Sequence, residues 1–317
     1  MNKKIGLLLS LGAVALALAG CSRDNLTVGA STKKADGMVA IIKGRVASKA
    51  KVSYSIDNAA TQSTKNVGGA YTIEIPSTTK EQKVKVTAKN DGSTISKTVT
   101  VEKEKRLADF SKFKDSFNQA IVGMNMSKSD QQLAQKLQKE GAELKKQAPA
   151  DPKKAQAELA AMPAAERVQA MQKMKAMQQQ ASDLKKQSAQ LQSDMDKIKN
   201  DKKDQLIPDS PKTGVTEWVN QKEYQIRGNY QNGDMMGLTV IATTKAMKHP
   251  SQAKGFGTAF GIAAKEVGAN PKDVMNQFKS YSKKAKSGQT TMKTITSNGV
   301  KFNIGLSTTR LYIYITK

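Results

Sequence analysis

The chain has 317 residues, and its 52 lysines and arginines against 27 acidic residues give a formal net charge of +25. A single cysteine excludes an internal disulfide framework, and a single histidine excludes sites built from several imidazoles. A hydrophobic content of 38% and a charged content of 25% are typical of folded domains joined to a polar helical segment. The length suggests about two or three domains.

Residues 1–20 have the layout of an export signal. Lys3 and Lys4 form a basic head, and residues 5–20, "IGLLLSLGAVALALAG", carry no charge. This apolar run is shorter than the roughly 20 residues that a membrane-spanning helix needs. We therefore expect residues 1–20 to be a signal peptide.

The sole cysteine lies at the end of this signal. The sequence Leu18-Ala19-Gly20-Cys21 resembles the lipobox of bacterial lipoproteins. The resemblance implies a diacylglycerol on the Cys21 sulfur, cleavage before Cys21 and a lipid-anchored protein on the outer, extracytoplasmic face of the cell membrane. Two acyl chains suffice for stable anchoring. The remaining cysteine-free chain favours a Gram-positive surface. The alternative is an ordinary signal peptide or anchor with an incidental cysteine.

Residues 21–36 follow the lipobox with small and polar residues, "SRDNLTVGASTKKAD" after the cysteine. This composition predicts a flexible tether between the lipid and the first domain.

Residues 37–104 alternate apolar and polar side chains. The runs "KVSYSI", "AYTIEI", "KVKVTA" and "TVTV" have the period of strands, and turn signals such as "NDG" separate them. We expect a β-sandwich in which each sheet has one solvated face. The stretch from "GGAYTIEIP" to "SKTVTVEK" resembles bacterial Ig-like surface domains, although the Cys…Trp…Cys signature of antibody domains is absent. The resemblance implies a spacer or an adhesion module.

Residues 106–206 carry helical periodicity. One apolar stripe is formed by Phe110, Phe113, Phe117 and Ile121, and a heptad repeat by Met177, Leu184, Leu191 and Ile198. A helix over 164–204 would be about 60 Å long. We expect a helical hairpin, a small antiparallel bundle or a self-associating coiled coil. The methionines Met171, Met174 and Met177 form either a packing seam or a groove for a protein partner.

Residues 212–317 predict an α+β domain. Asn232-Gly233 and Asn298-Gly299 are hairpin signals, a helix is expected near 251–268, and Asn270 caps a second helix that starts at Pro271. Strands are expected at 290–296, 300–306 and 309–316. The expected order is ββααβββ, an antiparallel sheet with a helix pair on one face. The full prediction is a multidomain chain of β-sandwich, helical segment and α+β domain.

The sequence lacks motifs for catalysis, metals or cofactors. His249 precedes Pro250 in a polar turn and is expected in a surface loop, and no HExxH, CxxC or EF-hand pattern occurs. Gly255, Gly257 and Gly261 do not have the spacing of a nucleotide-binding loop. Gly257 and Gly261 are four residues apart on the expected helix, and we expect them to permit close helix packing. We predict a non-enzymatic protein. Two alternatives stay open: a solute-binding lipoprotein of a transporter, and a wall hydrolase with an acid pair or a Ser–Lys site.

The strongest binding signal is cationic. Residues 212–317 contain 16 basic and 5 acidic residues, a net charge of +11. A basic surface beside a membrane attracts anionic wall polymers or lipid headgroups, and no nucleic acid is expected there. The candidate ligand residues are Lys272, Lys279, Lys283, Lys284, Lys286, Tyr312 and Tyr314. They predict a tyrosine-lined, lysine-rimmed face for a sugar-phosphate polymer, while solubility charge and core tyrosines are the alternatives.

Overall fold

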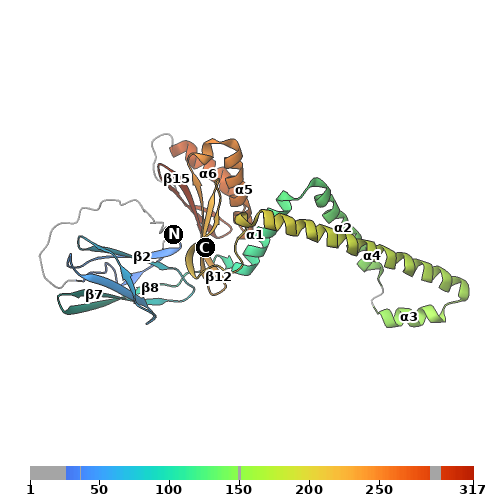
Figure 1. Cartoon of the computed structure of the whole chain (residues 1–317), viewed down its shortest axis with the longest axis horizontal. Helices are drawn as coiled ribbons and strands as arrows, with labels where there is room; N and C mark the ends of the chain where they lie inside the picture. Colours follow the sequence, from blue (N-terminus) through green and yellow to red (C-terminus); the bar gives the residue numbers. More distant parts are fainter. Residues whose placement is uncertain (1–25, 36, 149–150, 286–293) are drawn as a thin grey trace. The chain divides into compact units, whose positions relative to one another are not determined.

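The computed structural model describes residues 26–35, 37–148, 151–285 and 294–317 (Figure 1). The described chain divides into two compact units. Unit 1 comprises the described residues up to Lys33 together with Ile41–Glu74 and Gln82–Val101. Unit 2 comprises Lys34–Ala40, Ile75–Glu81 and Glu102–Lys317. The lipobox, with Leu18, Ala19, Gly20 and Cys21, lies outside the described residues.

Unit 1 is built from two sheets, which confirms the all-β expectation. The larger sheet has the order β1 (Thr32–Lys33), β8 (Ser93–Val101), β7 (Gln82–Asn90), β3 (Lys51–Ile56) and β4 (Gln62–Thr64). The smaller sheet has the order β2 (Val39–Arg45), β6 (Ala70–Pro76) and β5 (Asn66–Val67). The alternation of the strands buries one face of each sheet, including Ile42, Val52, Ile73, Val84, Val86 and Val99.

The first described residues belong to the fold of unit 1 and not to the expected tether. Leu26 and Val28 are buried, and β1 pairs in parallel with β8. The backbone N–H of Thr27 donates to the carbonyl of Arg45, and the Tyr71 hydroxyl donates to the carbonyl of Thr27. The alternation Leu26-Thr27-Val28 is a short strand-like signal inside a polar stretch. A tether predicted for 21–36 therefore ends before residue 26.

Unit 2 contains an antiparallel sheet of seven strands. Its order is β10 (Gly214–Asn220), β11 (Gln225–Gln231), β12 (Asp234–Thr243), β15 (Arg310–Thr316), β14 (Val300–Leu306) and β13 (Ile295–Ser297), and β9 (Ala108–Asp109) pairs with β12. The hairpins predicted at Asn232-Gly233 and Asn298-Gly299 are confirmed, with positive φ at both residues of each turn.

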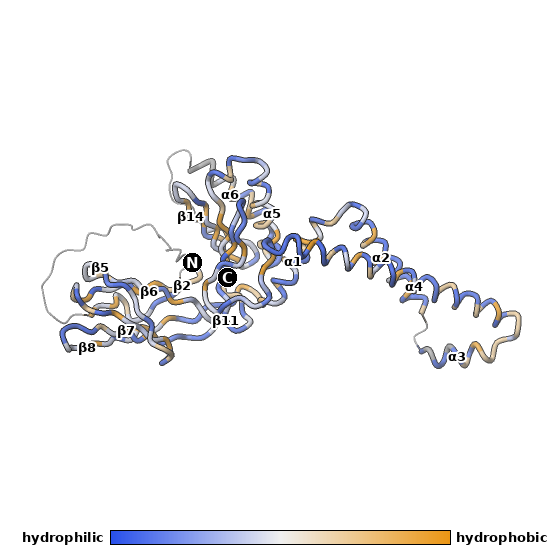
Figure 2. Tube along the Cα trace, viewed as in Figure 1, coloured by the Kyte–Doolittle hydropathy of each residue, from blue (hydrophilic) through white to orange (hydrophobic). Residues whose placement is uncertain are grey.

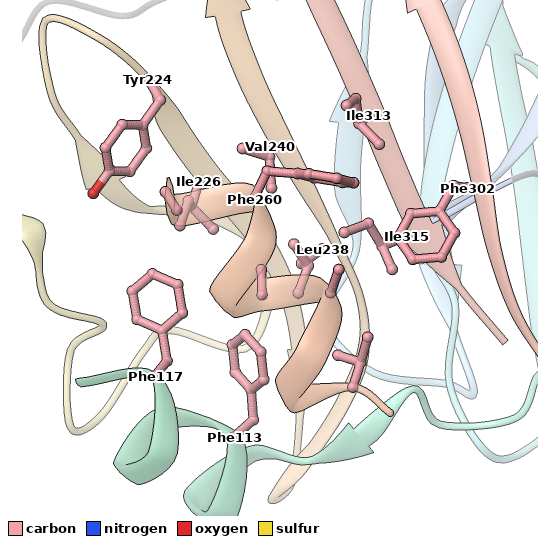
Figure 3. Packing of buried hydrophobic residues seen from close by; sticks show 14 of the residues in the cluster. Phe113, Phe117, Tyr224, Ile226, Leu238, Val240, Phe260, Phe302, Ile313 and Ile315 are labelled. Carbon is pink, nitrogen blue, oxygen red and sulfur yellow. The ribbon is translucent and has the colours of Figure 1, made fainter. Parts of the chain in front are cut away.

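Three helices cover one face of this sheet: α1 (Phe110–Asn125), α5 (Pro250–Glu266) and α6 (Pro271–Ala285) (Figure 1). Asn270 caps α6, as predicted, by accepting from the backbone N–H of Lys272 at 3.1 Å. Figure 3 shows the rings of Phe113, Phe117 and Phe260 directed toward the aliphatic side chains of the sheet. Those side chains include Ile226, Leu238, Val240, Ile313 and Ile315.

The expected order ββααβββ omits strands that the structure contains. β10 precedes the predicted first hairpin, so three strands come before α5, and the short β9 is added. A bulge between Glu217 and Val219 interrupts the alternation of β10, so the neighbours Trp218 and Val219 are both buried. The Trp218 ring lies over Gly228, where a Cβ would come within 2.2 Å of the indole. The sequence pattern of β10 therefore lacked a clean period of two.

α1 was expected in the helical segment, but it belongs to the core of unit 2. Its stripe of Phe110, Phe113, Phe117 and Ile121 is buried, as the periodicity predicts. The Phe110 ring packs edge-on against Trp218 and Tyr230, with ring centroids 5.4 and 4.9 Å apart. The three phenylalanines of α1 are buried because they pack against the apolar face of the sheet.

The other helices form a hairpin, here called the helical arm: α2 (Lys128–Gln147), α3 (Pro152–Ala161) and α4 (Ala164–Asp201). α4 has 38 residues, about 57 Å, and packs against α2. Hydrophilic residues predominate along both helices (Figure 2). Leu191 is the buried residue of α4, whereas Met171 and Met174 are exposed and thus form no packing seam with described residues.

Two further expectations concern single features. Among described neighbours, nothing lies within 4 Å of a Cβ built on Gly257 or Gly261, so close helix packing does not account for these glycines. No helix in the described ranges is both long and apolar enough to cross a membrane.

Candidate functional site: an aromatic and cationic sheet face

Strand β15 separates its side chains between the two faces of the seven-stranded sheet. Leu311, Ile313 and Ile315 are buried and pack with the helices in the core. Because successive side chains of a strand alternate, Tyr312 and Tyr314 lie on the opposite face, where both are half-buried. We call this opposite face, defined by Gln225, Arg227, Asn303, Arg310, Tyr312 and Tyr314, the tyrosine face.

The two tyrosine rings stack on each other. Their centroids are 6.2 Å apart and their planes differ by 10°. In β14, Gly305 is the cross-strand partner of Tyr312, and a Cβ there would lie 3.5 Å from the Tyr314 ring. A larger side chain at Gly305 would therefore cover part of the ring surface. The stacked pair places two parallel aromatic rings, each with a hydroxyl group, on this face.

Two arginines lie beside these rings. Arg227 on β11 and Tyr314 on β15 are both cross-strand partners of Thr239, so they lie on the two sides of that residue in one row. Arg310 reaches across β12, where its Nη1 donates to the Gln225 Oε1 at 3.4 Å. Neither arginine forms an ion pair with a residue that the structure describes. No described carboxylate therefore competes with an anionic ligand for these two guanidinium groups.

One carboxylate lies at the edge of the face. Glu217 on β10 is the cross-strand partner of Arg227, and its Oε1 accepts from the Asn220 amide at 2.9 Å. The outward positions of β11, β12, β14 and β15 carry no further acidic residue apart from Asp234 at the start of β12. Asp234 is held in an ion pair with Arg106 at 2.8 Å. The tyrosine face is therefore cationic overall.

The remaining end of the same sheet face is closed. Asn229 is completely buried, and its side-chain amide donates to the carbonyls of Met38 and Ser77 at 3.1 and 2.9 Å. Gly237 lies under the Met38 side chain, with 3.0 Å between a Cβ built there and the Met38 Cγ. Segments Lys34–Ala40 and Ile75–Glu81 of unit 2 thus cover this end. The covering segment also reaches the tyrosines, since a Cβ built on Gly37 would lie 3.9 Å from the Tyr314 ring.

The structure describes the side chain of one candidate lysine, Lys272, and does not place it beside the tyrosines. α6 belongs to the helical layer, because its Val274 is buried and its Phe278 packs against the core. Lys272 is exposed on this helix. The backbone of Lys279, Lys283 and Lys284 also lies in α6, but their side chains, and the whole of Lys286, lie outside the described part. Helix α6, with Lys272, and the tyrosine face therefore lie on opposite sides of the sheet.

Arg227 is the residue that sequence reasoning missed. The alternation around Ile226 places it on the outward face, so the signal was present in the strand pattern. The strand pattern does not give the register of β11, β12 and β15, so it could not show that Arg227 lies in one row with Tyr314. Arg310 was recognisable only as part of a general basic rim.

The rest of the described chain offers little for metal or imidazole chemistry. No group of three or more His, Cys, Asp or Glu in the described ranges is arranged to hold a metal ion. His249 is exposed immediately before α5, in the predicted surface position. No family model matches the chain, and no curated protein matches it either.

Proposed function

We propose that the chain is a non-enzymatic, lipid-anchored cell-surface protein that binds an anionic envelope component through the tyrosine face of unit 2. The anchor is Cys21, by the resemblance of residues 18–21 to a lipobox. The ligand is a wall polymer that carries phosphate groups and sugar rings. The observation that carries the proposal is the pair Arg227 and Arg310, which has no acidic partner among the described residues, beside the stacked Tyr312 and Tyr314.

Each part of the face has a task in this proposal. Guanidinium groups bind phosphate oxygens in a bidentate manner and stay charged at every physiological pH. The tyrosine rings supply a flat apolar surface with polar hydroxyl edges. The net charge of +11 over residues 212–317 draws a polyanion toward the unit before contact.

The test is co-sedimentation of the chain from Ser22 to Lys317 with purified cell wall, with and without teichoic acid, across a salt series. We expect binding that requires the polymer and weakens steeply with salt. The double substitution Arg227→Gln with Arg310→Gln should lower affinity roughly tenfold or more, because charged hydrogen bonds to phosphate are lost. Tyr312→Ala with Tyr314→Ala should cost about 2- to 10-fold.

The matched control is Lys254→Gln with Lys265→Gln, which removes the same charge from the exposed side of α5. This control should bind almost as the parent does. If the arginine variant and the lysine control lost affinity equally, binding would depend on net charge alone and the proposal would be wrong. A separate variant with Lys279→Gln, Lys283→Gln and Lys284→Gln tests whether α6 is the site instead.

A further inference from the structure

Unit 1 also has a sheet face of unusual composition. In the larger sheet, Val52, Val84, Val86 and Val99 are buried, so the alternate positions of β3, β7 and β8 face outward. All eleven outward positions of these strands are lysine, serine or threonine. We call them the lysine face: Lys51, Ser53, Ser55, Lys83, Lys85, Thr87, Lys89, Thr94, Ser96, Thr98 and Thr100.

Hydroxyl groups order part of this face. The Thr87 and Ser96 hydroxyls, which are cross-strand neighbours, lie 2.9 Å apart, and the Lys83 Nζ donates to the Thr100 hydroxyl at 2.9 Å. Lys51, Lys85 and Lys89 make no ion pair with any described residue. The face therefore combines fixed hydroxyls with three ammonium groups that have no counter-charge among the described residues.

The position of these lysines is energetically unfavourable for an isolated domain. Lys51 and Lys89 are direct cross-strand partners, and like charges in such pairs destabilise a sheet. Lysines commonly protect the edges of sheets against further pairing, but β7 is the central strand of the five. Edge protection therefore does not account for Lys85 and Lys89, whereas a bound polyanion would relieve their repulsion.

We propose that the lysine face binds a linear polyol-phosphate polymer. Outward residues of one strand repeat about every 6.7 Å, so Lys83, Lys85 and Lys89 form a line of charges at multiples of this spacing. The ammonium groups bind phosphodiesters, and the serine and threonine hydroxyls bind the hydroxyls of the linking polyol. The eleven positions include no aromatic or large aliphatic side chain, which disfavours stacked bases and inserted acyl chains. This role goes beyond the site on unit 2 and does not rest on it.

The decisive experiment measures binding of the chain from Ser22 to Lys317 to soluble poly(glycerol phosphate) by calorimetry at several salt concentrations. The variant Lys51→Gln with Lys85→Gln and Lys89→Gln should bind at least about tenfold more weakly, and the slope of log K against log salt should fall by roughly 2. The matched control is Lys43→Gln with Lys65→Gln and Lys97→Gln, three exposed lysines of unit 1 off this face. It should keep nearly all of the affinity.

The hydroxyls have their own test. Thr87→Val with Thr98→Val should weaken binding of poly(glycerol phosphate) by about 2- to 10-fold, the worth of lost hydrogen bonds. Binding of inorganic polyphosphate, which has no polyol, should not change. Equal effects on both polymers would overturn the assignment of the hydroxyls to the polyol.

The outcomes separate the two proposed sites. If the lysine-face variant and its control lost affinity equally, or if neither lost affinity, this inference would be wrong. A loss of affinity in the Arg227→Gln, Arg310→Gln variant would still support the site on unit 2. If the lysine-face variant lost affinity and the Arg227→Gln, Arg310→Gln variant did not, the lysine face would be supported as a binding site and the tyrosine face would not. A lysine-face variant that loses binding only to phosphatidylglycerol vesicles would show a membrane site and also contradict the polymer.

Discussion

A single buried amide organises the closed end of the sheet in unit 2. The Asn229 Nδ2 reaches the carbonyls of Met38 and Ser77 and also the Ser77 hydroxyl at 3.1 Å, while Gln231 donates to its Oδ1. These partners are 191 and 152 residues away in sequence. Buried carbonyls that lose their donor keep the full cost of desolvation. The hydrogen bonds of Asn229 therefore stabilise this end of the sheet.

The substitution Asn229→Ala should destabilise unit 2 by about 1–3 kcal/mol, because the Ser77 carbonyl loses its Asn229 donor and the Met38 carbonyl keeps only the backbone N–H of Ser77. Urea unfolding followed by the fluorescence of Trp218, the sole tryptophan of the chain, reports on this unit. Asn220→Ala is the control, since Asn220 is exposed and should shift stability by less than about 0.5 kcal/mol. If both variants changed the free energy of unfolding by a similar amount, the buried hydrogen bonds of Asn229 would contribute no more to stability than the exposed ones of Asn220.

For single residues, the sequence predicted the face of the strand on which a side chain lies better than the distant residues that it contacts. The alternation on β15 puts Tyr312 and Tyr314 on one face, and the structure agrees. The side of the sheet on which the α6 lysines fall depends on tertiary packing, and no local pattern encodes it. The contacts of Asn229 were equally hidden, because an asparagine in a strand has no local signature for distant carbonyl partners.

At the scale of elements, the buried phenylalanines of α1 explain why this helix packs on the sheet of unit 2 and not in the helical arm. Phe113 and Phe117 are 1% and 0% exposed, whereas the helical arm buries only Leu191 along the 38 residues of α4. Burial of a phenylalanine removes a large apolar area from water and fixes the helix on the sheet. α1 is therefore a stable part of unit 2, while the arm has few buried contacts to hold it.

Phe117→Ala should destabilise unit 2 by about 3–5 kcal/mol, the usual cost of an emptied aromatic site. Val168→Ala in α4 should change stability by less than about 0.5 kcal/mol, because that side chain is 55% exposed. Thermal and urea unfolding, followed through Trp218, compare the two. A small effect of Phe117→Ala would mean that α1 docks only weakly on the sheet.

Most elements followed from local signals, and the failures have physical causes. The hairpin turns, the Asn270 cap and the Phe stripe of α1 were predictable because each depends on neighbouring residues alone. β10 was missed because a bulge breaks its alternation. β1 was missed because it has only two residues, Thr32 and Lys33, in a polar stretch.

At the scale of the whole molecule, unit 2 is discontinuous in sequence. It includes Lys34–Ala40 and Ile75–Glu81, although most of it follows residue 102. Reading domains as consecutive stretches, at 37–104, 106–206 and 212–317, cannot reveal such an arrangement. Long-range contacts of this kind are properties of the folded chain and not of any window of sequence.

A fragment of residues 102–317 should therefore be less stable than the whole chain. It lacks the segments that cover Asn229 and Thr239, which are 0% and 2% exposed in the intact protein. We expect a lower urea midpoint for Trp218 fluorescence and stronger binding of a hydrophobic dye. A fragment with the midpoint of the intact chain would show that these segments contribute little.

The position of β15 constrains the order in which the fold can form. This strand, the last in the sequence, lies between β12 and β14 and joins the two halves of the sheet. Before residues 310–316 are in place, the two halves have no common partner and their apolar faces stay open. Unit 2 therefore completes its core only when β15 inserts between β12 and β14, and its open faces favour aggregation until then.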